Sequence, residues 1–200
     1  MSSNICKIIY INLDKRPDRR SEIEGELSRM GLVGERFPAI ETKPGYIGCS
    51  QSHRNILLRA IAENWENVLI LEDDFQFVID KKTFEERMVN FFTSKIPYDV
   101  LMISYNLFKA VPYNELISRT HDAQTTSGYL VHKSFYKTLL QNFEESVPHL
   151  IKGEPYPIYS IDKYWKRLQP TSAWFHFNTP MGIQRPGFSD IENTFVNYGK

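Results

Sequence analysis

Short apolar runs alternate with amphipathic stretches along the first half of the chain. Residues 7–13 (KIIYINL) are rich in β-branched and aromatic side chains, which predicts a strand. The polar turn DKRPD follows, and a helical pattern continues to about Met30. The segment ERFPAI then predicts a short extended piece. The chain is therefore expected to begin with a strand, a helix and a second extended segment.

A second helix and a third strand follow. The helix is predicted from apolar positions that recur on one face, and either Ser50 or Ser52 can cap its start. The positions on this face are Ile56, Leu57, Ala60 and Ile61. Residues 68–71 (VLIL) are all branched aliphatics, which favours a strand that is covered on both faces.

One more helix and strand complete the regular part of the pattern. Thr83 and Glu86 have the spacing of a capping box, which predicts a helix that continues through Phe92. Residues 99–105 (DVLMISY) then predict a strand. Strands that alternate with helices indicate the α/β class, here a mostly parallel mixed sheet with helices on both faces. In such sheets ligands bind at the carboxyl ends of the strands.

The second half of the chain is less regular. The predicted segments are loops at 111–126 and 152–161, strands near 128–131 and 174–177, and helices at Ser134 and Asp162. The chain contains no internal repeat, no low-complexity tract and no linker rich in Pro, Gly or Ser. We therefore expect a single domain over residues 1–200.

Composition limits the partners of this chain. The 42% of hydrophobic residues among 200 is enough for the core of an ordinary globular protein. Lys plus Arg equals Asp plus Glu at 24 each, so no overall field attracts nucleic acid or an anionic membrane. Cys6 and Cys49 have neither metal-ligand spacing nor a disulfide framework, which fits a reducing compartment. No apolar run approaches the length of a membrane span. A cytoplasmic protein is expected, with a peripheral position at a membrane surface as the alternative.

Three consecutive carboxylates follow the strand predicted at 68–71. Glu72, Asp73 and Asp74 repel one another unless a cation or a set of donors offsets the repulsion. On an extended chain Glu72 and Asp74 point the same way, roughly 7 Å apart, so they could share one metal ion. A solvated turn is the alternative, because acidic residues are common where strands end.

Two further groups of polar residues are candidates. A basic cluster follows the first predicted strand and consists of Lys15, Arg16, Arg19 and Arg20. The N-terminus of the following helix would add backbone N–H groups, so a diphosphate could bind there. The alternative is a solvated basic helix face paired with glutamates. His53 shares a face with apolar residues, so we interpret it as a half-buried structural histidine rather than a metal ligand or a base, with a hydrogen bond to substrate or to a neighbouring loop left open.

The end of the chain offers candidates with equally simple structural explanations. Asp162 can cap a helix, Asp190 can belong to a turn, and Trp165 and Trp174 can be core residues or walls for a sugar ring. The chain has no G-x-S-x-G, G-x-G-x-x-G or P-loop motif. Nucleophilic hydrolysis and dinucleotide or P-loop binding are therefore set aside.

Four stretches of the chain, in this order, resemble glycosyltransferase family 25, which includes bacterial lipooligosaccharide galactosyltransferases and procollagen galactosyltransferases. They are INLDKRPDRR (11–20), IGCSQSH (47–53), VLILEDDF (68–75) and SGYLVHKSFYKTLL (127–140). IDKYW and a Q-x-x-x-x-SDIE pattern complete the series, so the resemblance spans nearly the whole chain. The chain departs from the family in a short loop after Ala39 and in larger side chains at 135–137. These differences affect the expected identity of the acceptor more than the expected reaction.

The resemblance implies a GT-A type fold, with a nucleotide-binding part at about 1–106 and an acceptor-side part at about 107–200. The implied reaction moves galactose or glucose from a UDP-sugar to a hydroxyl group of a glycan or glycoprotein, with inversion at the anomeric carbon. A divalent cation, Mn²⁺ before Mg²⁺, is implied as cofactor. No nucleic acid and no membrane span is expected.

The resemblance also implies roles for individual residues. Those expected to contact the nucleotide or its metal ion are Asn12, Arg16, Arg19, Glu72, Asp73, Asp74 and Gln184. Asp74 is expected to be the direct metal ligand, and Glu72 or Asp73 to reach the metal through water or to hold the ribose. Inversion in one displacement needs a base for the acceptor hydroxyl, for which Asp162 is the first candidate and Asp190 the second.

Two other functions remain as alternatives. A nucleotidyltransferase acting on a sugar phosphate can use a similar fold and acidic metal site, but the chain has no Gly-rich N-terminal phosphate loop. A non-catalytic glycan- or protein-binding module of the same fold would have no need for the carboxylates that the motifs retain.

Overall fold

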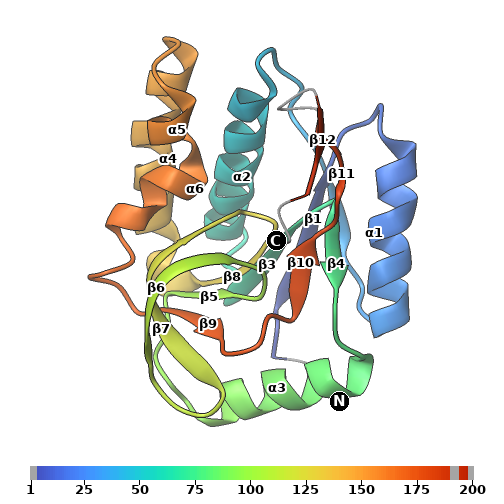
Figure 1. Cartoon of the computed structure of the whole chain (residues 1–200), viewed down its shortest axis with the longest axis vertical. Helices are drawn as coiled ribbons and strands as arrows, with labels where there is room; N and C mark the ends of the chain where they lie inside the picture. The colour runs from blue at the N-terminus through green and yellow to red at the C-terminus, as the bar shows by residue number, and fades with distance from the viewer. Residues whose placement is uncertain (1–3, 190–193, 198–200) are drawn as a thin grey trace.

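The computed structural model describes residues 4–189 and 194–197. Eight strands form one mixed sheet in the order β2-β1-β3-β8-β5-β9-β7-β6 (Figure 1). Their bounds are β1 Lys7–Asn12, β2 Glu35–Pro38, β3 Asn67–Glu72, β5 Val100–Met102, β6 Asn106–Pro112, β7 Ile117–Gln124, β8 Gly128–His132 and β9 Trp174–Phe177. All of these strands run in one direction except β7 and β8. The predicted α/β class with a mostly parallel mixed sheet is confirmed.

Helices and two small strand pairs surround this sheet. The helices are α1 Pro17–Met30, α2 Gly45–Ala62, α3 Lys81–Thr93, α4 Tyr136–Ile151, α5 Tyr156–Tyr159 and α6 Ile161–Tyr164, with 3-10 turns at η1 Lys133–Phe135 and η2 Trp165–Arg167. The small antiparallel pairs are β4 Phe75–Phe77 with β10 Gly182–Gln184, and β11 Gly187–Ser189 with β12 Thr194–Val196. Within the described residues, no helix combines the length and the apolar character needed to cross a bilayer. The cytoplasmic location stays a prediction.

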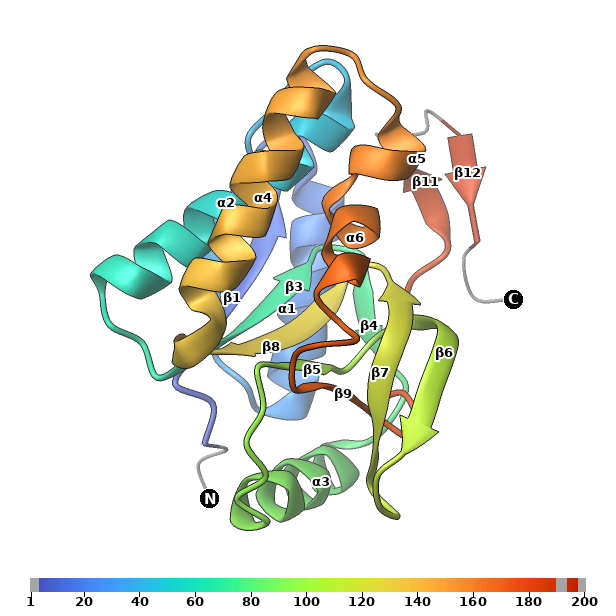
Figure 2. The ribbon, with the colours of Figure 1, turned by 90° about the vertical axis from the view of Figure 1, so that its left-hand side faces the viewer.

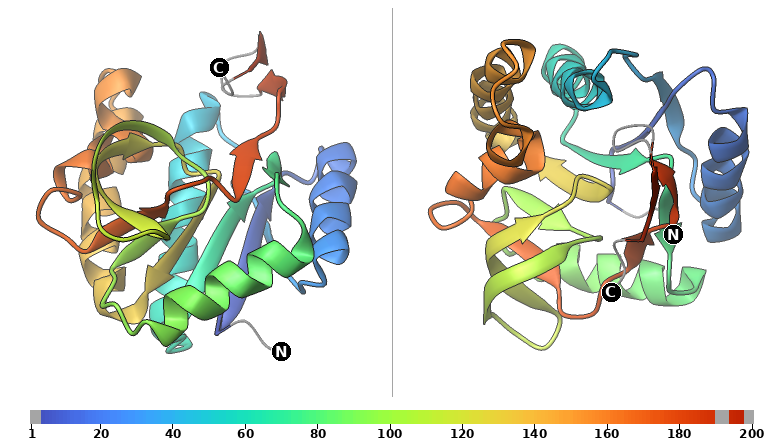
Figure 3. Two further views of the ribbon diagram at one scale, coloured as in Figure 1. Left: turned by 60° about the horizontal axis from the view of Figure 1, so that its bottom comes forward. Right: turned by 45° about the horizontal axis from the view of Figure 1, so that its top comes forward.

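The two faces of the sheet are covered by different helices. Figure 2 shows α2 and α4 side by side on one face, and Figure 3 shows α1 and α3 on the other. Residues from the first pair that enter the core are Ile56, Leu57, Ala60, Leu139 and Phe143. Residues from the second pair are Ile23, Leu27, Met30, Phe84, Met88 and Phe91. Trp165 and Trp174 are fully buried in the first of these cores, so they are core residues rather than walls for a sugar.

Strand register brings distant segments to one edge of the sheet. Strands β1 and β3 are parallel with Ile11 opposite Glu72, so Asn12 and the carboxylates after β3 meet at the carboxyl ends of these strands. Strand β8 runs against β3 and pairs its first residue, Gly128, with Leu71. The residues just before β8 therefore lie at this same edge, although they come from the second half of the chain.

The segment predicted as a loop at 111–126 is instead most of the β6–β7 hairpin. The hairpin forms the outer edge of the sheet, where most β6 side chains face solvent. The largest part of the segment is β7, which pairs with β9 and β6 but buries only Ile117, Thr120 and Ala123, so its sequence lacks the continuous apolar run of a strand covered on both faces.

The predicted starts of two helices are also wrong. Helix α2 begins at Gly45, and Ser50 and Ser52 lie inside it, where their hydroxyls donate to carbonyls one turn earlier. Helix α3 begins at Lys81 because the Asp80 side chain, rather than Thr83, caps it by accepting the Thr83 N–H at 2.8 Å. Local hydrogen-bonding residues occur at several neighbouring positions in both segments, and tertiary packing selects one of them.

Candidate active site

A cleft of about 310 Å³ opens at the carboxyl ends of β1 and β3. It is lined by residues from both halves of the chain, which the sheet register brings together. The predicted site residues among them are Asn12, Arg19, Glu72, Asp73, Asp74, Asp162 and Gln184. The cleft therefore lies where the sequence predicted a ligand site, at the carboxyl ends of parallel strands, while the assignment and the role of each residue stay predictions.

Asp73 and Asp74 lie in the turn between β3 and β4, and Arg19 of α1 bridges them. The Arg19 guanidinium donates to Asp73 Oδ1 at 3.0 Å and to Asp74 Oδ2 at 3.3 Å. Its other terminal nitrogen donates to the Phe188 carbonyl at 2.7 Å. Asn12 Nδ2 donates to Asp73 Oδ2 at 2.8 Å, so the Asn12 side chain orients this carboxylate. One arginine thus offsets part of the repulsion among the three acids.

Asp74 is the most perturbed of the three carboxylates. Burial, followed by the negative charge of Glu72, raises the pKa of Asp74 to about 7. Gln184 Nε2 donates to Asp74 Oδ2 at 3.1 Å, and the Arg19 bond reaches the same oxygen. The other oxygen, Oδ1, is buried and has no hydrogen-bond partner among the described residues. A buried carboxylate oxygen in this state favours either a proton or a cation.

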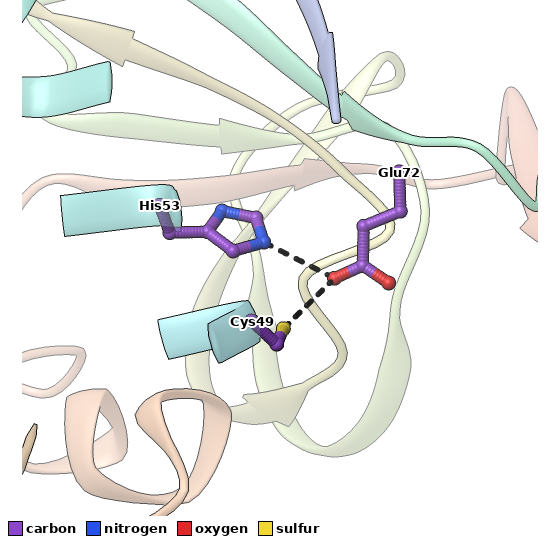
Figure 4. Close-up of side chains that lie close together, drawn as sticks. All are labelled: Cys49, His53 and Glu72. Carbon is purple, nitrogen blue, oxygen red and sulfur yellow. Dashed lines mark hydrogen bonds and ion pairs between the residues drawn. The ribbon is translucent and has the colours of Figure 1, made fainter. Parts of the chain in front are cut away.

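Two residues of α2, Cys49 and His53, approach one oxygen of Glu72 (Figure 4), and a residue of the segment before β8 holds the same oxygen. Glu72 Oε1 lies 3.2 Å from His53 Nε2 and 4.0 Å from Cys49 Sγ, and it accepts a hydrogen bond from the Thr126 hydroxyl. His53 Nδ1 lies 2.8 Å from the Tyr129 hydroxyl. Burial raises the pKa of Glu72, but the His53 hydrogen bond and the other donors outweigh burial and leave that pKa below its usual value. Glu72 is therefore ionised and firmly oriented.

Asp162 lies on the side of the cleft formed by the second half of the chain. It belongs to the first turn of α6, and Ser160 Oγ donates to its Oδ1 at 2.9 Å. The Thr125 N–H donates to Asp162 Oδ2 at 3.3 Å, and the Thr125 hydroxyl donates to Gln184 Oε1 at 3.2 Å. Thr125 has φ of 84°, which is a rare conformation for a β-branched residue. Through Thr125 and Gln184, hydrogen bonds connect Asp162 to Asp74 across the cleft.

Two predicted residues are not part of this arrangement. Arg16 is not among the residues that line the cleft, and its side chain pairs with Asp18 at 2.7 Å. Sequence placed Arg16 and Arg19 on one side of a helical turn, but the carboxylates accept hydrogen bonds from the Arg19 side chain. Asp190, the second candidate base, lies outside the described residues.

Several cleft residues were not predicted from the sequence. Thr125 and Thr126 fell in a predicted loop, and their position follows from the start of β8. Tyr46 and Tyr156 also line the cleft, with ring centroids 4.8 Å apart. Tyr129 does not line the cleft but supports it through His53, and its place in the SGYLVH motif was the sequence signal that this region lies near the site.

The divalent cation implied by the family resemblance fits these residues. The observation that supports this fit is Asp74 Oδ1, a buried oxygen without a hydrogen-bond partner in the described part of the chain. It lies in a cluster of three carboxylates that Arg19 neutralises only in part. Hard cations such as Mn²⁺ and Mg²⁺ prefer carboxylate oxygens. Asp74 and Glu72 are the residues that would hold such an ion.

Comparison with known proteins gives homologues over part of the chain. No family model matches it. A Glycosyltransferase 25 family member from Drosophila pseudoobscura pseudoobscura is 32% identical over 122 residues, which are 47% of this chain and 20% of the relative. The Drosophila melanogaster protein of the same name is 30% identical over 126 residues, 49% of this chain and 21% of the relative. The chain thus spans about a fifth of the length of these curated relatives.

A solved structure shares the fold. The crystal structure of A197 from STIV superposes with a TM-score of 0.51 and covers 98% of this chain and 95% of that one, at 10% identity. This similarity concerns the arrangement of strands and helices alone. Over about half of its length, the chain is a homologue of proteins named as members of glycosyltransferase family 25.

Proposed function

We propose that this chain is a metal-dependent glycosyltransferase that moves galactose or glucose, with inversion, from a UDP-sugar to a hydroxyl group of a glycan or glycoprotein. The observation that carries the proposal is the convergence of Glu72, Asp73 and Asp74 with Arg19 on one side of a cleft and Asp162 on the other. The homology to glycosyltransferase family 25 over about half of the chain supports it.

The carboxylate side of the cleft would bind the donor diphosphate. A divalent ion held by Asp74 and Glu72 would supply positive charge to neutralise the diphosphate as it leaves. Arg19 would release one of its carboxylate bonds and donate to a phosphate oxygen, which its planar guanidinium can do with two N–H groups. Asn12 would keep Asp73 oriented through this change, because its amide already bonds Asp73 at 2.8 Å.

The opposite side of the cleft would bind the acceptor. Asp162 would take the proton of the attacking hydroxyl as its oxygen bonds to the anomeric carbon and the bond from that carbon to the diphosphate oxygen breaks. The N–H of Thr125 and the hydroxyl of Ser160 each bond one Asp162 oxygen, which fixes the carboxylate without using all of its acceptor capacity.

Thermal unfolding with nucleotides tests the proposal directly. The panel contains UDP, UTP, UDP-sugars and GDP-sugars, each with and without Mn²⁺, on the native chain and on Asp74→Ala. A rise in Tm with UDP that requires Mn²⁺ and is lost in Asp74→Ala is expected, because a ligand that binds only the folded state stabilises it. Glu86→Ala is the matched control, since Glu86 is an exposed acid on α3 that does not line the cleft.

The same panel separates the alternatives. Stabilisation by UTP in preference to UDP and UDP-sugars would indicate a nucleotidyltransferase. No rise in Tm with any nucleotide would contradict the transferase proposal and leave a binding module. Product analysis with the best UDP-sugar and a set of glycoside acceptors then gives the sugar and the anomeric configuration of the product.

A further inference from the structure

One wall of the cleft carries a second set of metal-ligand types, formed by Cys49, His53 and Glu72 (Figure 4). Cys49 and His53 are four residues apart on α2, which puts them on the same side of the helix. Glu72 is the last residue of β3 and faces them. One ligand atom from each residue lies within 4.8 Å of the other two. Thiolate, imidazole and carboxylate are all ligands that Zn²⁺ takes in proteins.

The distances between these atoms are close to those around a tetrahedral ion. Zn–S bonds of about 2.3 Å and Zn–N and Zn–O bonds of about 2.1 Å separate N from O by about 3.4 Å and S from O by about 3.6 Å. In the structure, His53 Nε2 lies 3.2 Å from Glu72 Oε1, and Cys49 Sγ lies 4.0 Å from the same oxygen. These two separations are within a few tenths of an ångström of the tetrahedral values, and the third pair, Sγ and Nε2, lies within 4.8 Å.

The surroundings of His53 are those of a metal ligand. His53 and Tyr129 are fully buried, and the Tyr129 hydroxyl lies 2.8 Å from His53 Nδ1. A ligating histidine usually donates its second ring N–H to such a partner, which fixes the ring and leaves Nε2 for the ion. Cys49, His53 and Glu72 all line the cleft, so an ion has a path to them and a fourth ligand can be water.

We propose that Cys49, His53 and Glu72 form a Zn²⁺ site whose fourth position opens to the cleft. On binding, a Zn–S bond replaces the S–H bond of Cys49, and the proton leaves to solvent. Cys49 and His53 both contact Glu72 Oε1 when no ion is bound, so the three ligand atoms are already close together before the metal arrives. It differs from the proposed Mn²⁺ position in its ligands, since it uses a thiolate and an imidazole in place of Asp74.

Co²⁺ binding followed by absorption spectroscopy tests the site without any nucleotide. Co²⁺ bound to a thiolate gives a charge-transfer band, and Zn²⁺ removes that band when it displaces Co²⁺. The native chain and Cys6→Ser are expected to show the band, because Cys6 is the exposed cysteine and does not line the cleft. Cys49→Ser is expected to lose the band. It is also expected to bind Zn²⁺ at least 10- to 100-fold more weakly, because removing only a hydrogen-bond partner of a metal ligand already lowers affinity by that factor.

A second variant leaves all three ligands in place. Tyr129→Phe removes only the hydroxyl next to His53 Nδ1, so the thiolate band is expected to remain while Zn²⁺ affinity falls about 10- to 100-fold. Absence of the band in the native chain, its persistence in Cys49→Ser, or its loss in Cys6→Ser would each overturn the proposal. The three residues would then form a hydrogen-bonded network only.

Zn²⁺ at this site would also act on donor binding, a consequence that rests on the proposed function. Glu72 drawn toward α2 by Zn²⁺ would be less available to the Mn²⁺–UDP complex. One equivalent of Zn²⁺ is therefore expected to reduce the rise in Tm caused by UDP and Mn²⁺ in the native chain but not in Cys49→Ser. A cobalt–thiolate band without any UDP effect would support the Zn²⁺ site and contradict the transferase proposal, so the two failures are distinguishable.

Discussion

Asp74→Asn removes a buried negative charge from the acidic cluster while it keeps the size of the side chain. The pKa of Asp74 is raised from 3.8 to about 7, chiefly by burial and then by the charge of Glu72. The folded protein therefore binds this proton more tightly than the unfolded chain. The stability that the proton provides is fully present below the unfolded pKa and is lost as the pH rises through the folded pKa.

The expected size of the effect follows from these two pKa values. One pKa unit corresponds to about 1.4 kcal/mol, so the ionised Asp74 lowers the free energy of unfolding by about 4 kcal/mol at pH 8. At pH 5 the proton is lost only from the unfolded chain, and this lowers the free energy of unfolding by about 2 kcal/mol. Because asparagine carries no charge at either pH, Asp74→Asn is expected to be more stable than the native chain by these amounts when no metal is bound.

Urea unfolding followed by circular dichroism, in EDTA at pH 5 and pH 8, measures this difference. The control is Asp80→Asn, which replaces an exposed helix cap whose pKa is lowered by its bond from the Thr83 N–H. Because pH 5 and pH 8 both lie above the unfolded pKa of this carboxyl group, Asp80→Asn is expected to change stability equally at the two pH values. An advantage of Asp74→Asn that is equal at both pH values, or a loss of stability at pH 8, would refute the reasoning. With Mn²⁺ and UDP added, the native chain is expected to gain stability and the variant is not.

Three further predictions concern the cleft and its support. Asp162→Asn is expected to lower transfer to the acceptor at least 100-fold with the UDP-induced rise in Tm unchanged, and a native rate would remove Asp162 as the base. Thr125→Gly is expected to unfold at the native urea midpoint or above it, because glycine adopts a φ of 84° without strain. The same variant is expected to bind UDP and Mn²⁺ more weakly, because it lacks the hydroxyl that orients Gln184, and unchanged binding would contradict this. Gly182→Ala is expected to cost about 1–3 kcal/mol in the same unfolding experiment, because the added methyl would lie 2.1 Å from Phe75 Cζ, and a native midpoint would show that the Phe75 ring moves aside.

The strands of the central sheet were predictable because burial leaves a local signal. The aliphatic run at 68–71 falls inside β3, and the predicted strand near 174–177 has the same bounds as β9. Strands covered on both faces need continuous apolar residues, and the sequence shows them. Strand β7 is paired on both sides but is only partly buried and carries mostly polar residues, which is why it was predicted as a loop.

The sequence by itself determined that three carboxylates follow a buried strand, and the α/β pattern determined that they lie where ligands bind. Only the tertiary structure decided which residues face them. Arg19 meets Asp73 because α1 packs against β1 and β4, next to the turn that carries the carboxylates, and Thr125 lies near Asp162 because β8 runs against β3.

The residues next to Glu72 could likewise not be predicted from the sequence. Cys49 and Glu72 are 23 residues apart and show no ligand spacing, so their 4.0 Å approach depends on the packing of α2 against the sheet. Short stretches of sequence show local propensity and burial. By contrast, a cluster formed by two residues of one helix and the end of a strand depends on how distant segments pack together. That packing is set by the whole core and cannot be read from any single motif.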